Sequence, residues 1–73
     1  MTAEESLTKA EELLARLETV RARLEHTEDP GQAVEILEEL NDLAKAVETE
    51  VQRAKRAAET EAAAPPPPDA GVD

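Results

Sequence analysis

The sequence predicts an all-α protein, an antiparallel two-helix hairpin with heptad, coiled-coil-like packing and a disordered proline-rich C-terminal tail. Two segments rich in Leu, Ala, Glu and Arg carry apolar residues at helical spacing, and a short turn-forming segment separates them. Four consecutive prolines follow the second segment and end it. We expect a helical hairpin over residues 1–63, with a helix at about 3–26, a turn at 27–29 and a helix at about 30–62, followed by a tail over 64–73.

The first helix has a clear predicted start. Thr2 is placed to accept a hydrogen bond from the backbone N–H of Glu5, whose side chain can reach back in a capping box. Glu4 and Glu5 lie in the first turn, where negative charge suits the helix dipole. We expect this helix to end near His26 or Thr27.

A second start follows within a few residues. Asp29 is a good N-cap, Pro30 suits the first helical position, and Gln32 falls at the third. Because so short a link favours antiparallel neighbours, the two helices are expected to fold back on each other.

The tail reads as non-helical. The prolines Pro65 to Pro68 lack backbone N–H groups and favour a short polyproline II segment with a disordered end. Such a run can be a ligand for an SH3-type groove, but no basic residue flanks it, and a solvated tail is the favoured interpretation.

Apolar residues define one face on each helix. In the second segment an unbroken heptad series predicts the packing seam, comprising Ala33, Leu37, Leu40, Ala44, Val47, Val51, Ala54 and Ala58, with Val34, Ile36 and Leu43 beside it. The first segment has the same register at Ala10, Leu13, Leu17, Val20 and Leu24, with Leu7 and Leu14 beside it. The predicted interaction surface is Leu7, Leu13, Leu14, Leu17, Val20, Leu24, Ile36, Leu37, Leu40, Leu43, Val47 and Val51.

Charge favours the same antiparallel arrangement. The first helix begins with acidic residues and ends with Arg21 and Arg23, whereas the second begins with acidic residues and has Arg53, Lys55 and Arg56 towards its end. Folding at Asp29 therefore brings basic groups beside acidic ones. Each exposed pair contributes only about 0.2–1 kcal/mol, so charge selects the orientation and apolar burial supplies the stability.

Composition excludes several classes of function. The chain has 73 residues, no Cys, no aromatic residue and a net charge of -10. Without aromatic rings there is no platform for stacking bases, and the acidic balance opposes binding to a phosphate backbone, so direct nucleic-acid binding is not expected. No apolar run approaches the length of a membrane span, and the N-terminus has no signal-peptide pattern, so a cytoplasmic, non-membrane protein is expected.

No residue set predicts catalysis, a cofactor or a metal site. His26 is the only imidazole, and it reads as a cation near a helix C-terminus. Paired glutamates such as Glu38 and Glu39 are expected on a solvated face, because acid–base work needs a concave, partly dry site. The chain is therefore expected not to be an enzyme.

Association is the expected activity. A core of about 60 residues without disulfide or metal seldom supplies more than about 3–5 kcal/mol, and the apolar stripes are too wide for two helices to cover. We expect docking on a partner protein or self-association, in preference to a marginal monomeric hairpin.

One stretch resembles a known family. Leu17-Glu18 and Leu24-Glu25 on the first helix, then Ala33, Leu37-Glu38-Glu39 and Leu43 on the second, are similar to the small subunit of exodeoxyribonuclease VII. The match covers about residues 10–56; it departs from the family at Leu37, usually Phe or Tyr, and at Leu40, usually Gly. The resemblance implies a non-catalytic subunit that docks on the helices of a nuclease large subunit.

Two alternatives remain open at this point. The chain can be a stand-alone homo-oligomeric coiled-coil or adaptor protein. It can also be an acidic, antitoxin- or chaperone-like hairpin that masks a basic partner, which its net charge motivates.

Overall fold

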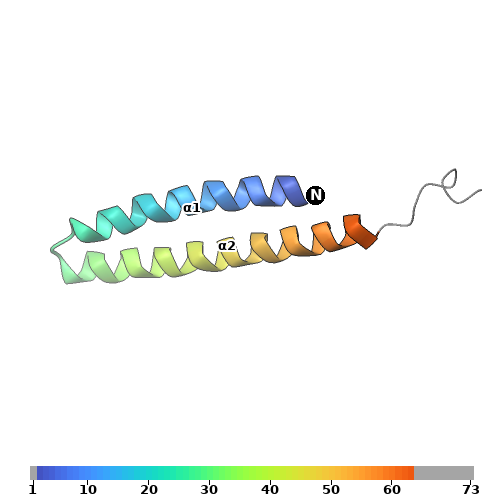
Figure 1. The fold of residues 1–73 in the computed structure, drawn as a ribbon. Coiled ribbons are helices and arrows are strands. Elements are labelled where there is room, and N and C mark those ends of the chain that lie inside the picture. The colour runs from blue at the N-terminus through green and yellow to red at the C-terminus, as the bar shows by residue number, and fades with distance from the viewer. Residues whose placement is uncertain (1, 64–73) are drawn as a thin grey trace, which may run out of the picture.

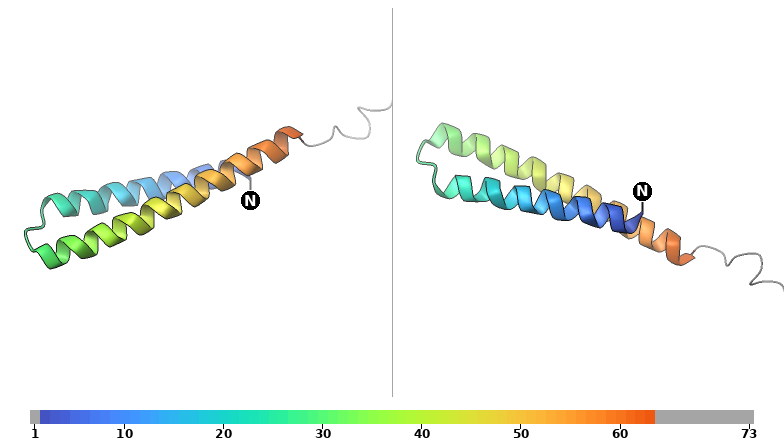
Figure 2. Two further views of the ribbon diagram at one scale, coloured as in Figure 1. Left: turned by 90° about the horizontal axis from the view of Figure 1, so that it is seen from below. Right: turned by 90° about the horizontal axis from the view of Figure 1, so that it is seen from above.

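The computed structural model describes residues 2–63, which form two helices, α1 (Ala3–Glu25) and α2 (Pro30–Ala63). The helices run antiparallel, and residues 26–29 join them at one end (Figure 1). Two further views show that the helices cross at a shallow angle (Figure 2). The described residues contain no strand, and the predicted all-α hairpin is confirmed. The predicted polyproline tail lies outside the described residues.

Local capping residues set both helix starts. The Thr2 hydroxyl oxygen accepts from the Glu5 N–H at 3.1 Å, as the capping pattern predicts. Asp29 caps α2, because its Oδ1 accepts from the Gly31 N–H at 3.1 Å and its carbonyl accepts from the Ala33 N–H at 2.9 Å.

The end of α1 is closed by its last turn and by the residues that follow. The His26 N–H donates to the Arg23 carbonyl and the Thr27 N–H donates to the Leu24 carbonyl, each at 3.2 Å. The Thr27 hydroxyl also donates to the Arg23 carbonyl at 2.7 Å. These bonds satisfy carbonyls that would otherwise lack partners at the helix end.

The core lies between the helices and is thickest near the turn. Val20, Ile36 and Leu43 are buried there, and four leucines pack around them: Leu13, Leu17, Leu24 and Leu40. Towards the open end the buried residues are Ser6, Ala10, Glu50 and Ala54, of which only Glu50 is large. The hairpin therefore has one compact apolar cluster at its closed end, and beyond it a seam of small side chains and one carboxylate.

The residues of α2 that face α1 differ from the predicted seam: at every second seam position, the residue one place earlier in the sequence is the buried one. Ile36 and Leu43 are buried, whereas Leu37 is 52% exposed and Val51 is 46% exposed. Ile36 with Leu43 removes more apolar area from water than Leu37 with Ala44, because alanine has little side chain to bury. The cost of this rotation is that Glu50, not Val51, enters the seam.

The C-terminal end of α2 extends past the start of α1, because α2 has 34 residues and α1 has 23 (Figure 1). Ala54 is 5% exposed and Ala57 is half-buried, whereas residues 58–63 are all exposed. The contact between the helices therefore ends near Ala57.

Candidate interaction surface

The main candidate site is an uncovered apolar face. Five large hydrophobic side chains lie about half in water, each between 46% and 54% exposed. We call this set the apolar face; its members are Leu7 and Leu14 on α1, and Val34, Leu37 and Val51 on α2. Scattered exposed leucines are ordinary on protein surfaces, so the argument depends on whether these five lie together.

Heptad positions show that they lie on one flank of the hairpin. In heptad letters, the seam between the helices consists of positions a and d. Position a holds Ala10 and Leu17 on α1 and Leu40 and Val47 on α2, and position d holds Val20 on α1 and Ile36 and Leu43 on α2. Leu7 and Leu14 then occupy e positions of α1, and Leu37 and Val51 occupy e positions of α2.

Antiparallel helices place e beside e on one flank of the seam and g beside g on the other. The ion pair from Arg23 to Glu39, at 3.3 Å, joins two g positions and so marks the g flank. The e positions of both helices therefore share the opposite flank, so the apolar face draws on both α1 and α2, with Arg21 and Ala44 at e positions on the same flank.

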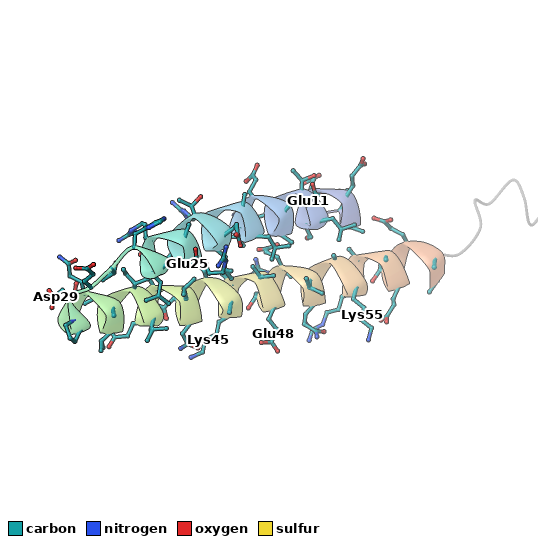
Figure 3. All side chains as sticks on the ribbon, turned by 60° about the vertical axis from the view of Figure 1, so that its left-hand side comes forward. Glu11, Glu25, Asp29, Lys45, Glu48 and Lys55 are labelled. Atoms are coloured by element: carbon teal, nitrogen blue, oxygen red, sulfur yellow. The ribbon has the colours of Figure 1, made fainter. Side chains whose placement is uncertain are left out.

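An acidic column borders this face on α1. Glu4, Glu11, Glu18 and Glu25 are spaced by seven residues, so they stack along one line of the helix, at the b positions next to e. All four are exposed. Glu11 points outward from α1 in Figure 3. Sequence reasoning did not single out this column, although its seven-residue spacing was the available signal.

One arginine beside the acidic column, at the e position that follows Leu7 and Leu14, is already engaged. Arg21 donates from Nε to Glu18 at 3.0 Å, and its Nη1 donates to Glu25. The hydrogen bond from Arg21 lowers the pKa of Glu18 below its ordinary value. The same bonds, to Glu18 first and Glu25 second, raise the pKa of Arg21. The charges of Glu18 and Glu25 are thus partly neutralised by Arg21 within the chain.

Glu50 is the unusual residue of the seam. It is 4% exposed, its Oε1 accepts from Arg53 Nη1 at 2.7 Å, and its Oε2 has no hydrogen-bond partner among the described residues. A carboxylate at a d position lowers packing quality, because charge is costly to remove from water. Sequence reasoning missed it, since Val51 looked like the seam residue.

Most cross-helix charge pairs expected from the sequence do not form. Arg23–Glu39 is the one ion pair that joins the helices within residues 2–63, and the other pairs lie within a helix. Lys55 points away from α1, together with Lys45 and Glu48 (Figure 3). The start of α1 instead meets α2 through the Ala3 N–H, which donates to the Glu61 carboxylate at 3.4 Å.

The predicted interaction surface divides into two sets with different roles. Eight of its residues pack between α1 and α2 or border that seam: Leu13, Leu17, Val20, Leu24, Ile36, Leu40, Leu43 and Val47. The other four, Leu7, Leu14, Leu37 and Val51, belong to the apolar face and are about half exposed. Val34 joins them, although the prediction placed it only beside the seam.

Other features of the described residues offer less. A shallow groove beside the turn is lined by Arg23, His26, Gln32 and Glu39, on the g flank, and is open to solvent. No cluster of three metal-ligating side chains occurs in residues 2–63. Neither α1 nor α2 is long and apolar enough to cross a bilayer.

Comparisons with known proteins give no family. No protein-family model, no curated protein and no solved structure matches the chain. The functional argument therefore depends on the geometry and charge of the hairpin itself.

Proposed function

We propose that this chain is a non-catalytic interaction subunit that docks through its apolar face on the helices of a partner protein. The observation that carries the proposal is the collection of five half-exposed hydrophobic side chains on one flank of the hairpin. An exposed apolar surface rimmed by charge is typical of protein–protein contact sites.

Energetics support docking over a solitary hairpin. The buried apolar set of the described residues is small, with Val20, Ile36 and Leu43 at its centre. Burying a large aliphatic side chain contributes about 1.5–3 kcal/mol, so covering several half-exposed ones adds several kilocalories per mole. For a hairpin whose own core supplies about 3–5 kcal/mol, that addition is a large share of its stability.

The resemblance noted in the sequence selects a first partner to test. We propose a nuclease large subunit with long helices, in a cytoplasmic setting, as the docking partner, and the chain itself supplies no reacting group. This choice is supported by the Leu-Glu and Ala–Leu-Glu-Glu pattern of Leu17 to Leu43, and by the helical hairpin that this pattern forms.

Binding of the full chain to a purified exodeoxyribonuclease VII large subunit tests this partner, with calorimetry as the measurement. We expect a complex that Leu14→Ser with Val51→Ser weakens at least tenfold, while Glu38→Gln on the outer face leaves it unchanged. If the chain does not bind the large subunit and does not change its activity, the nuclease partner is rejected. If the Leu14 and Val51 changes leave binding unaltered, the apolar face is rejected as the docking surface.

A further inference from the structure

We propose, building on the docking function above, that the apolar face receives a partner helix whose own apolar stripe is bordered by Lys or Arg on the flank that lies over α1. The partner is thus an amphipathic helix of another protein with a one-sided basic column. The argument uses the acidic column, the opposite rim of the face and the charge of a second copy.

The acidic column determines the chemistry of the partner. Glu4 and Glu11 have no ion pair within residues 2–63, and Glu18 and Glu25 share the single guanidinium of Arg21. Glu4, Glu11 and Glu18 stand beside Leu7 and Leu14, at the rim where a docked helix ends its apolar contact. Charge at a rim gives specificity and a faster association rate when the partner carries the opposite sign.

The opposite rim determines the asymmetry. On α2 the b positions beside the apolar face are Val34, Asn41, Glu48 and Lys55. This rim is apolar at one end and carries one charge of each sign further along, so it does not call for a basic column. A helix that lies on the apolar face, across α1 and α2, therefore needs cations on one flank only. This asymmetry also determines which side of the partner helix faces α1.

A second copy of the chain fits this surface poorly. Each chain has a net charge of -10, and the cations beside its apolar face are Arg21, which is already paired, and Lys55. Packing two such faces together brings the acidic column of each copy against a rim with a single free cation. Like charges at an interface cost affinity, so the observations favour a basic partner over self-association.

Spacing defines the length of the partner segment. The column runs from Glu4 to Glu25 with one carboxylate per heptad. A helix that matches it needs Lys or Arg at the same seven-residue interval over about three heptads, or roughly 32 Å at 1.5 Å per residue. Shorter basic peptides can meet only part of the column.

The test uses the full chain and two synthetic four-heptad peptides with Leu at the first and fourth heptad positions. One peptide has Lys along one flank and the other has Glu there. Fluorescence anisotropy measures binding of each labelled peptide at low and at physiological salt. We expect the Lys peptide to bind and the Glu peptide to bind at least tenfold more weakly, with a gap that narrows as salt rises.

Charge-matched variants locate the contact. Glu4→Gln with Glu11→Gln removes two rim charges, and Glu38→Gln with Glu59→Gln removes two from the outer face of α2. We expect the rim variant to bind the Lys peptide about three- to tenfold more weakly, as two exposed ion pairs imply, and the outer-face variant to bind nearly as the parent does. Circular dichroism checks that both variants remain helical.

The outcomes separate this inference from the docking function. Equal losses in both variants, equal binding of both peptides, or no binding of the Lys peptide overturn the basic-flank partner. If Leu14→Ser with Val51→Ser still reduces peptide or large-subunit binding in those cases, the docking function stands. Sedimentation equilibrium tests self-association. If the parent chain is a dimer and Leu14→Ser with Val51→Ser makes it a monomer, the apolar face binds a second copy and the inference is overturned.

Discussion

Glu50 shows how a single side chain can limit the stability of a small hairpin. Its carboxylate is buried with one oxygen bound to Arg53, which is itself more than half exposed, and the other oxygen without a partner in the described residues. Replacing a buried, partly satisfied charge with an apolar side chain is often stabilising. We expect Glu50→Leu to raise the free energy of unfolding by about 1–2 kcal/mol, measured by urea denaturation.

The matched control for Glu50 is Glu48, which lies two residues earlier and points away from α1 (Figure 3). Glu48→Leu adds the same side chain outside the seam and is expected to change stability by less than about 0.5 kcal/mol. A Glu50→Leu protein that is less stable than the parent contradicts a costly burial, and indicates that the carboxylate is satisfied in solution.

The Arg21 hydrogen bonds give Glu18 a pH signature. The pKa of Glu18 is lowered in the folded chain from its ordinary value of 4.5, so its contribution to stability is full above 4.5 and disappears as pH falls through the lower folded value. We expect Glu18→Gln to melt at a lower temperature than the parent at pH 7, with the difference closing in acid. Thermal melts by circular dichroism from pH 7 to pH 2 measure it. A difference that persists at pH 2 assigns the effect to something other than the carboxylate charge.

At the scale of the helices, the sequence predicted boundaries well and the seam less well, for a physical reason. Helix starts depend on local capping groups, so Thr2 and Asp29 could be identified from the residues beside them. The seam depends on both helices at once. Because Ile36 and Leu37 are adjacent and both apolar, the pattern of α2 allows either one to face α1, and only the fit against Val20 and its neighbours decides.

The same ambiguity affected the candidate site. Leu7 and Leu14 stood beside the predicted seam of α1 and were identified correctly as flanking residues. The α2 half of the apolar face was assigned to the seam, since a one-residue rotation exchanges Leu37 and Val51 for Ile36 and Glu50. A sequence pattern does not give the free-energy cost of burying Glu50, so it could not decide between the two rotations of α2.

A pair of truncations tests the observed rotation of α2. Leu43 is 9% exposed and belongs to the core, whereas Leu37 is 52% exposed. We expect Leu43→Ala to lower the free energy of unfolding by about 2–3 kcal/mol, because it leaves a cavity, and Leu37→Ala to lower it by less than about 1 kcal/mol. Thermal or urea denaturation of the two variants under one condition compares them. A larger loss of stability for Leu37→Ala than for Leu43→Ala would instead support the predicted seam, in which Leu37 faces α1.

At the scale of the whole molecule, net charge opposes the compact state. The chain carries -10, and the described ion pairs lie mostly within one helix, where they do little to hold the two helices together. Folding brings the acidic surfaces of α1 and α2 closer than they are in an expanded chain, so self-repulsion weakens the hairpin most when screening is weak. The Debye length falls from about 30 Å at 0.01 M salt to about 10 Å at 0.1 M.

Salt is therefore expected to act in opposite directions on the free hairpin and on its complex. Raising sodium chloride from 0.01 M to 0.5 M should stabilise the free chain by about 1 kcal/mol, or roughly 4–8 °C in Tm for a domain of this size, because it screens repulsion. The same change should weaken binding of a helix with a basic flank, because it screens attraction. Melting curves and binding isotherms over one salt series measure both effects. A Tm that falls with salt would mean that pairs such as Arg23–Glu39 outweigh the acidic excess, and that the hairpin needs no cationic partner to offset its charge.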